Sequence, residues 1–328
     1  MIPVTLLTGF LGSGKTTLLQ RLLTDPGMAR AAVLINEFGE VGLDHHLLDR
    51  IDENVVLMKS GCICCTVRGE VADALLNLQG MRTRGEIDFD RVVIETTGLA
   101  DPYPVLQTLR AHPVLRSHFE NGGVLTTVDA VNAARQVENR AEAVRQIAAA
   151  DRIVLTKTDL AQEEDIAALC ATLSRVNPSA RVLTSMDPTD AIVSHLDPGV
   201  PTLPEVEETQ GNHHHHHHLN EDLGVVTFSL TVKESVDWTE FGIWLTLLLH
   251  RHGDRIFRFK GILAIAGEDR PVAVHGVQHL VHAPVHMKHW PEGPRTSRMV
   301  FILEGLDPER IRRSFAAFMR LKSVKAVA

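Results

Sequence analysis

Residues 9–16 read GFLGSGKT, and this stretch decides the fold. It fits the pattern G-x-x-x-x-G-K-[ST] of a phosphate-binding loop. The apolar run IPVTLLT precedes it at 2–8, and a helical pattern covers 15–24. Because a strand–loop–helix context is what such a loop requires, we favour a nucleotide-phosphate site over an ordinary glycine turn before a helix.

The residue types in this loop predict individual roles. Gly12 and Gly14 allow backbone N–H groups to turn inward around phosphate oxygens. Lys15 is expected to reach the β- and γ-phosphates and to act in catalysis by offsetting transition-state charge, and the Thr16 hydroxyl is expected to bind Mg²⁺. The N-terminus of the following helix adds a favourable positive partial charge. The predicted nucleotide-binding residues of the loop are Gly12, Ser13, Gly14, Lys15, Thr16 and Thr17.

Outward from the loop, apolar runs alternate with amphipathic segments. Runs rich in β-branched residues predict strands that are covered on both faces. They span 2–8, 31–36, 54–58, 91–95, 123–128, 152–157 and 180–184. Helical patterns lie between several of them, including 15–24, 67–79, 101–110 and 162–174. This alternation predicts an α/β fold, a doubly wound and mostly parallel sheet with right-handed crossovers.

The sequence changes character after residue 195. Residues 196–222 hold prolines, an acidic run and six consecutive histidines at 213–218, and we interpret them as a linker or exposed loop. From 223 to 328 the strand patterns run together, which predicts a smaller α+β domain. The strand patterns there lie at 224–232, 255–266, 271–275, 279–286 and 298–304, and the helical patterns at 237–250 and 308–320. The predicted domains are therefore 1–195 and 223–328.

A second stretch fits the nucleotide site. Residues 92–98 read VVIETTG, an apolar strand that ends in a carboxylate. Glu95 is expected to act in catalysis, by holding the Mg²⁺ shell or by positioning the attacking water. Gly98 is expected to offer its backbone N–H near the γ-phosphate.

A third stretch, TKTD at 156–159, follows another apolar strand and is similar to the guanine-reading pattern N-K-x-D. Asp159 is expected to accept hydrogen bonds from guanine N1–H and N2–H₂, and the Lys157 stem to pack on the base. Thr156 replaces the usual asparagine, which leaves part of the base selectivity open. A Thr/Asp pair that caps the next helix is a compatible alternative.

Composition excludes several classes of protein. The chain of 328 residues has a formal net charge of −8, which argues against a broadly basic nucleic-acid binder. Aromatic residues make up 5%, too few for a surface that stacks single-stranded bases. No apolar run reaches the roughly 18 residues of a membrane helix, and the apolar N-terminus lacks the basic flank of a signal peptide. We expect a cytoplasmic protein with no nucleic-acid or membrane partner.

Three of the four cysteines crowd into GCICC at 61–65. In a chain with no export signal, crowded thiols indicate metal or redox chemistry in a reducing compartment. Cys62 and Cys64 can project to the same side of an extended segment, and Cys65 then needs a turn to join them. Because a vicinal disulfide is strained, we favour thiolates that bind a soft metal such as Zn²⁺ or Cu⁺. A structural zinc site would need a second ligand pair, and Cys170 stands alone in a helical pattern.

Taken in order, these motifs resemble those of the CobW-type GTPases, P-loop metallochaperones related to the nickel-insertion GTPases of urease and hydrogenase maturation. The resemblance rests on GFLGSGKT (9–16), NEFGEVGLD (36–44), GCICC (61–65), ETTGLADP (95–102) and TKTD (156–159). RFKG (258–261), HGVQ (275–278) and Trp290 before the MVFIL strand are similar to the CobW C-terminal domain. The resemblance implies a GTP hydrolase that uses GTP and Mg²⁺ and carries a transition metal.

The resemblance also implies the metal ligands. The implied transition-metal ligands are Glu37, Cys62, Cys64, Cys65 and His112. Glu37 matches the family's switch I glutamate, which joins the thiolates. His112 matches a histidine near that site, and a surface histidine at a helix end is the alternative. Glu40 and Asp44 match switch carboxylates that could face Mg²⁺ or its water, and a solvated loop is the alternative for Glu40.

The histidine tract at 213–218 has two interpretations, an inserted purification tag or a native metal-recruiting loop. We favour the native loop because the tract is internal, whereas tags are normally terminal. Imidazoles bind Zn²⁺, Ni²⁺, Co²⁺ or Cu²⁺ without choosing strongly among them.

The predicted function is that of a cytosolic GTPase that delivers Zn²⁺, with Co²⁺ or Ni²⁺ as alternative metals, to a client metalloprotein. The C-terminal domain is expected to help recognise the client or to complete a homodimer. The rival hypotheses are a cobalt-handling factor in cobalamin synthesis and a metal buffer built on the histidine tract.

Overall fold

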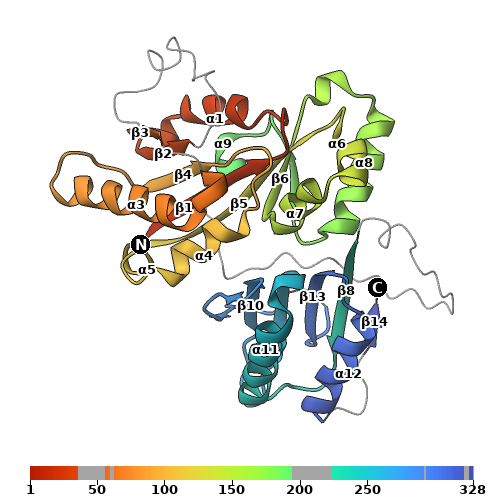
Figure 1. The fold of residues 1–328 in the computed structure, drawn as a ribbon. Helices are drawn as coiled ribbons and strands as arrows, with labels where there is room; N and C mark the ends of the chain where they lie inside the picture. The colour runs from red at the N-terminus through yellow and green to blue at the C-terminus, as the bar shows by residue number, and fades with distance from the viewer. Residues whose placement is uncertain (36–55, 60–62, 194–223, 292, 321–324, 328) are drawn as a thin grey trace. The chain divides into compact units, whose positions relative to one another are not determined.

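The computed structural model describes residues 1–35, 56–59, 63–193, 224–291, 293–320 and 325–327 (Figure 1). The chain divides into two compact units. Unit 1 is formed by Met1–Cys170 and Arg181–Leu196, and unit 2 by Ala171–Ala180 and Asp197–Ala328. None of the helices in the described ranges is long and apolar enough to cross a membrane.

Unit 1 is built on a seven-stranded sheet in which every pairing is parallel. Its strands are β1 (Ile2–Gly9), β2 (Ala31–Ile35), β3 (Val56–Lys59), β4 (Arg91–Glu95), β5 (Phe119–Asp129), β6 (Arg152–Thr156) and β7 (Arg181–Thr184). Their order across the sheet is β3-β2-β4-β1-β5-β6-β7. Because β1 lies between β4 and β5, the loops that follow these three strands meet at the carboxyl edge of the sheet, where open α/β sheets bind ligands.

Helices cover both faces of this sheet (Figure 1). On one face lie α1 (Lys15–Leu23) and α9 (Thr189–Val193), and the leucines of α1 pack against Leu7 and Val33 of the strands. The other helices of the unit are α3 (Ile63–Thr83), α4 (Tyr103–Ala111), α5 (Leu115–His118), α6 (Ala133–Asn139), α7 (Ala141–Ala149) and α8 (Glu163–Val176). Every residue of β2 and β6 is buried, which is why these runs are continuously apolar or nearly so.

Unit 2 contains an antiparallel sheet with the order β11-β10-β9-β13-β8-β14, and β12 pairs with β10. Its strands are β8 (Val225–Val232), β9 (Ile256–Leu263), β10 (Val272–Val277), β11 (Leu280–Val281), β12 (Val285–His286), β13 (Ser297–Glu304) and β14 (Lys325–Val327). Two helices, α11 (Trp238–His252) and α12 (Pro308–Phe318), bury their apolar sides in one core with the sheet. In that core the Trp244 ring meets Phe315 edge to face, with centroids 4.8 Å apart.

The fold class predicted from the sequence is confirmed, and all seven strands predicted for the first part of the chain are present. Boundaries differ where a neighbouring strand decides them. β5 starts at Phe119 rather than at 123, because its amino end pairs with Ile2 of β1. The strand predicted at 279–286 is divided into β11 and β12, and the segment between them contains Pro284, which has no N–H to donate to a sheet.

Candidate nucleotide and metal site

The phosphate-binding loop connects the carboxyl end of β1 to the first turn of α1. Gly12 and Gly14 have φ angles of 72° and 82°, left-handed values that residues with a Cβ atom rarely adopt. The Ser13 N–H donates to the Phe10 carbonyl at 3.1 Å and closes the turn. The Ser13 hydroxyl is buried and hydrogen-bonds Thr127 of β5 at 2.6 Å. The predicted phosphate role of Ser13 therefore falls to its backbone, while its side chain ties the loop to the sheet.

Lys15 is the first residue of α1, and its ammonium group lies over the loop. Nζ donates to the carbonyl oxygens of Gly9 at 2.8 Å and Phe10 at 3.2 Å. The residue is buried, so its charge is held beside the loop and away from bulk solvent. A phosphate oxygen is an ionised acceptor, and it hydrogen-bonds an ammonium more strongly than a neutral carbonyl does. The loop therefore presents a positioned cation to a bound phosphate.

A hydroxyl–carboxylate pair accompanies the lysine. Thr16 Oγ1 donates to Glu95 Oε1 at 2.7 Å. Glu95 is the last residue of β4, it pairs with Leu7 of β1, and it is 3% exposed. A buried carboxylate and a hydroxyl are the hard oxygen donors that Mg²⁺ prefers. These residues therefore fit the Mg²⁺ that accompanies a nucleotide in a site of this kind.

The loop after β4 closes on the phosphate-binding loop. A Cβ atom on Gly98 would lie 2.7 Å from the backbone Cα and N atoms of Leu11, so a side chain at this position would clash. The two loops and Lys157 line an open cavity of about 430 Å³. Its lining residues are Leu11, Gly12, Gly14, Lys15, Thr16, Thr17, Glu95, Thr96, Thr97, Gly98 and Lys157. The structure thus brings together the predicted nucleotide-site residues apart from the Ser13 side chain and Asp159.

The TKTD segment supports the same loop from β6. Thr156 Oγ1 donates to the Ser13 carbonyl at 2.8 Å, and Lys157 Nζ donates to the Gly12 carbonyl at 2.8 Å. The Thr156 hydroxyl therefore braces the phosphate-binding loop from the position where the N-K-x-D pattern has an amide. Asp159 lies on a short 3-10 helix, η2 (Thr158–Leu160), and is exposed, so a base can approach it from solvent.

Asp129, the last residue of β5, is a site residue that the sequence analysis misses. Its Oδ2 accepts from Lys157 Nζ at 2.7 Å and from Asn132 Nδ2 at 3.0 Å, and its Oδ1 accepts the N–H groups of Val131 and Asn132. Burial raises the pKa of Asp129, but hydrogen bonds from Lys157, Asn132 and Val131 lower it by more, so the pKa lies below its ordinary value. The ionised carboxylate holds Lys157 at the cavity. The signal available in the sequence was a carboxylate directly after an apolar strand.

Two of the five predicted transition-metal ligands, Glu37 and Cys62, lie outside the described residues. The switch carboxylates Glu40 and Asp44 and the histidine tract at 213–218 also lie outside them. For Cys64 and Cys65 only the backbone is described. Within the described part of the chain, no group of three or more His, Cys, Asp or Glu side chains is placed to hold a metal.

Cys64 and Cys65 lie in the first turn of α3, which begins at Ile63. Cys64 is therefore helical rather than extended, and Cys62, its partner in the expected pair, lies outside the described residues. The helix pattern was recognised only from residue 67, since GCICC by itself has no helical periodicity.

His112 lies elsewhere in unit 1. It follows Ala111, the last residue of α4, in the connection that leads to the amino end of β5. α3 instead starts after the carboxyl end of β3. Because the sheet is parallel, His112 lies toward the amino ends of the strands and the start of α3 lies toward their carboxyl ends. His112 Nδ1 accepts the N–H of Leu115 at 3.4 Å. Among the described residues, the contacts of His112 fit the alternative, a histidine at a helix end.

A parallel sheet of this order, a phosphate-binding loop after β1 and a buried glutamate that ends β4 define a P-loop nucleotide-binding protein. Residues 3–184 match the family model "CobW/HypB/UreG, nucleotide-binding domain", and residues 225–319 match "Cobalamin synthesis protein cobW C-terminal domain". The chain belongs to the CobW/HypB/UreG family, and it is a P-loop GTPase of that family.

One similar protein matches over nearly the whole chain, and another matches over about half of it. The chain is 38% identical over 328 residues to the zinc chaperone YjiA of Escherichia coli (strain K12), covering 97% of this chain and 99% of that protein. It is 37% identical over 189 residues to zinc-regulated GTPase metalloprotein activator 1 of Schizosaccharomyces pombe, covering 56% of this chain and 45% of that protein.

Solved structures of YjiA are also similar. The crystal structure of Zn(II)-bound YjiA GTPase from E. coli matches with a TM-score of 0.76 and 34% sequence identity, covering 97% of this chain and 98% of that chain. A Zn(II)-bound structure of a YjiA triple mutant, in which one glutamate and two cysteines are replaced by alanine, matches with a TM-score of 0.77 over the same shares.

Proposed function

We propose that this protein is a GTP-hydrolysing zinc chaperone, which holds zinc in one nucleotide state and yields it to a client metalloprotein in another. The observation that carries the proposal is the position of α3. It begins within GCICC, directly after the carboxyl end of β3, at the same edge of the sheet as the nucleotide cavity. The similarity to a zinc chaperone over nearly the whole chain supports zinc as the cargo. The similarity to a zinc-regulated GTPase metalloprotein activator supports a client protein.

In this proposal the cavity binds the phosphates of GTP. The loop N–H groups and Lys15 hold the β- and γ-phosphates, while Thr16 and Glu95 hold Mg²⁺. When bound, Mg²⁺ neutralises charge that builds up on the phosphate oxygens. Lys15 stabilises the same developing charge from the loop, and Glu95 also positions the attacking water. Gly98 places its backbone next to the γ-phosphate.

Lys157 and Asp159 recognise guanine in this proposal. Lys157 is fixed by Asp129 and the Gly12 carbonyl, so its stem is held beside the cavity where a base would pack. The exposed Asp159 carboxylate accepts from the two donors of guanine. Adenine presents an acceptor at N1, so the carboxylate disfavours it.

The zinc ligands that we propose are Glu37, Cys62, Cys64 and Cys65. Soft thiolates select zinc over Mg²⁺, and Cys64 and Cys65 lie in the first turn of α3. Glu37 follows β2, which pairs with both β3 and β4. Because this segment corresponds to a GTPase's first switch, recognition of the γ-phosphate moves Glu37 and changes the zinc coordination. His112 is left out because it lies at the far end of α4.

We assign the steps of delivery to different parts of the chain. The GTPase domain spans 1–195, the segment 196–222 recruits metal through the histidine tract, and the CobW C-terminal domain spans 223–328. This C-terminal domain recognises the client or completes a homodimer. The protein acts in the cytoplasm without a nucleic-acid or membrane partner.

Zinc affinity in the two nucleotide states tests the proposal. Coupling between linked sites is typically about 5–150-fold in affinity, so wild-type affinity with GDP and with a non-hydrolysable GTP analogue should differ by a factor in that range. The Cys64→Ala/Cys65→Ala variant should lose the difference. Cys170→Ala is the matched control, because Cys170 is a half-buried free cysteine on α8. This variant should keep the wild-type difference, and so should His112→Ala.

The decisive readout is the nucleotide dependence and not the total zinc bound. The YjiA triple mutant still carries Zn(II) without one glutamate and two cysteines, so some zinc is expected to stay bound in the cysteine variant as well. Equal wild-type affinities in the two nucleotide states would refute the proposal. A nucleotide dependence that survives in the cysteine variant would remove the cysteines from the mechanism.

The rival functions are separated by two further measurements. Deletion of 213–218 should lower the number of weakly bound metals and spare GTP hydrolysis, whereas a metal buffer would lose its function. Competition among Zn²⁺, Co²⁺ and Ni²⁺ in the presence of the GTP analogue distinguishes a zinc chaperone from a cobalt-handling factor.

A further inference from the structure

Gln146 is a buried polar residue that contacts a loop far away in the chain. It lies on α7 and is 1% exposed. Its side-chain Nε2 donates to the carbonyl oxygens of Gly98 at 3.2 Å and Ala100 at 3.1 Å. Gly98 lines the nucleotide cavity. One amide group therefore holds the backbone on both sides of Leu99.

The backbone that Gln146 holds is a turn. The Ala100 N–H donates to the Thr97 carbonyl at 3.1 Å, which closes the turn over Gly98 and Leu99. Gly98 also packs on Leu11, so closely that a Cβ atom would lie 2.7 Å from the Leu11 backbone. The turn is thus held between the phosphate-binding loop and Gln146.

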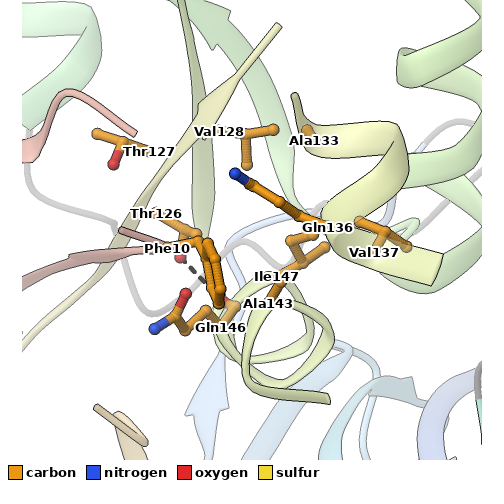
Figure 2. A pocket seen from close by; sticks show the side chains of 10 residues that line it. All are labelled: Phe10, Thr126, Thr127, Val128, Ala133, Gln136, Val137, Ala143, Gln146 and Ile147. Atoms are coloured by element: carbon orange, nitrogen blue, oxygen red, sulfur yellow. Dashed lines mark hydrogen bonds between the residues drawn. The ribbon is translucent and has the colours of Figure 1, made fainter. Parts of the chain in front are cut away.

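Gln146 is itself fixed in position. Thr126 Oγ1 of β5 donates to the Gln146 backbone carbonyl at 3.0 Å (Figure 2). Phe10 of the phosphate-binding loop lines the same small cavity as Gln146, with Ala143 and Ile147 of α7 (Figure 2). The cavity has a volume of about 10 Å³, so little free space lies beside the Gln146 side chain.

A buried amide side chain destabilises the fold unless hydrogen bonds compensate for its burial. In the described part of the chain, Gln146 Oε1 is buried and accepts no hydrogen bond. A buried acceptor without a partner destabilises the fold, so packing alone would favour an apolar side chain of the same size. The two bonds from Nε2 to the turn give the physical reason for a glutamine.

We propose that Gln146 is a positioning residue that keeps the Thr97–Ala100 turn in the place where its backbone meets the γ-phosphate of GTP. A turn that is already in place has no ordering cost to meet when the triphosphate binds. GDP has no γ-phosphate, so Gln146 affects its affinity little. Gln146 thereby contributes to the discrimination between GTP and GDP. This inference rests on the proposed nucleotide site.

The test compares two nucleotides in three variants of the full chain. Gln146→Met keeps the side-chain volume and removes both donors. Gln136→Met is the matched control, because Gln136 lines the same cavity from α6 and is not bonded to the turn. Lys15→Ala reports on the nucleotide site itself. The dissociation constants of GDP and a non-hydrolysable GTP analogue are measured for each variant, together with the unfolding temperature.

For Gln146→Met the affinity for the GTP analogue should fall by about 5–100-fold, the factor for two ordinary hydrogen bonds. GDP affinity should change by less than about twofold, and Gln136→Met should behave like wild type.

The outcomes separate the inference from the nucleotide site beneath it. Equal losses of GDP and GTP-analogue affinity in Gln146→Met would assign Gln146 a merely structural role and overturn the inference, as would wild-type affinities for both nucleotides. If Lys15→Ala leaves GTP-analogue affinity intact, the nucleotide site is misplaced and the inference falls with it.

Discussion

Replacement of Asp129 by asparagine should loosen the guanine end of the nucleotide site while preserving its shape. The Oδ1 atom accepts the backbone N–H groups of Val131 and Asn132, and an asparagine oxygen can keep both bonds. The Oδ2 atom accepts from Lys157 Nζ and Asn132 Nδ2, which are both donors. The asparagine NH₂ group would face these donors, so both bonds are lost.

The structure sets the size of this effect. A hydrogen bond to a charged group contributes about 1.5–3 kcal/mol. The Lys157 side chain is 37% exposed, so solvent screens its part of the interaction and we expect a loss of about 1–2 kcal/mol. For a unit of this size that corresponds to an unfolding temperature lower by roughly 2–8 °C. GTP affinity should also fall, because Lys157 is no longer held beside the cavity.

Thermal unfolding at several pH values tests the reasoning. The folded pKa of Asp129 lies below its ordinary value, so its stabilisation is fully present above the unfolded pKa of about 3.9. It is lost as the pH falls from about 5 through the folded pKa, and the difference between variant and wild type should shrink over that range. Asp159→Asn is the control, because that exposed carboxylate should change stability by less than about 0.5 kcal/mol. An unchanged unfolding temperature in Asp129→Asn at pH 7 would refute the argument.

Three further predictions concern the same site. Lys15→Ala should abolish GTP hydrolysis while cooperative unfolding is retained, and wild-type turnover would remove the phosphate-loop assignment. Gly98→Ala should place a Cβ atom 2.7 Å from the Leu11 backbone and lower stability by about 1–3 kcal/mol, with weaker GTP binding; calorimetry that shows neither change would contradict the close approach. Wild-type protein should prefer GTP to ATP in competition binding, and Asp159→Ala should lose most of that preference; equal wild-type affinities would argue against the TKTD assignment.

Most of the residues predicted for the nucleotide site line one cavity, because they lie in contiguous motifs. Gly12 and Gly14 take left-handed φ angles, and Lys15 and Thr16 follow them directly, so backbone shape and chemistry are specified by adjacent residues. Glu95 could be found in the same way, as a carboxylate that ends an apolar strand. Element boundaries were less predictable, because pairing with a neighbouring strand extends β5 and a proline lies between β11 and β12.

His112 shows that a residue close to a motif in sequence can lie far from it in the fold. It comes soon after ETTGLADP, which lines the nucleotide cavity through Glu95 and Gly98. α4 separates it from that segment and carries it toward the amino edge of the sheet. A short distance in sequence becomes a large one in space when a helix lies between, because each helical residue advances the chain by about 1.5 Å in a fixed direction.

By itself, then, the sequence determined the parallel sheet, the phosphate-binding loop and the residues that chemistry places in contiguous motifs. Only the tertiary structure decided that Asp129 holds a lysine 28 residues away and that Gln146 holds a turn 48 residues away. The sequence signal at each residue is ambiguous, since an aspartate at the end of a strand also suits a turn and a glutamine on a helix also suits solvent. A hydrogen bond forms only within about 3.5 Å and along a restricted direction. The partner of a side chain is therefore decided by how the fold brings distant segments together, and not by the residues next to it in the sequence.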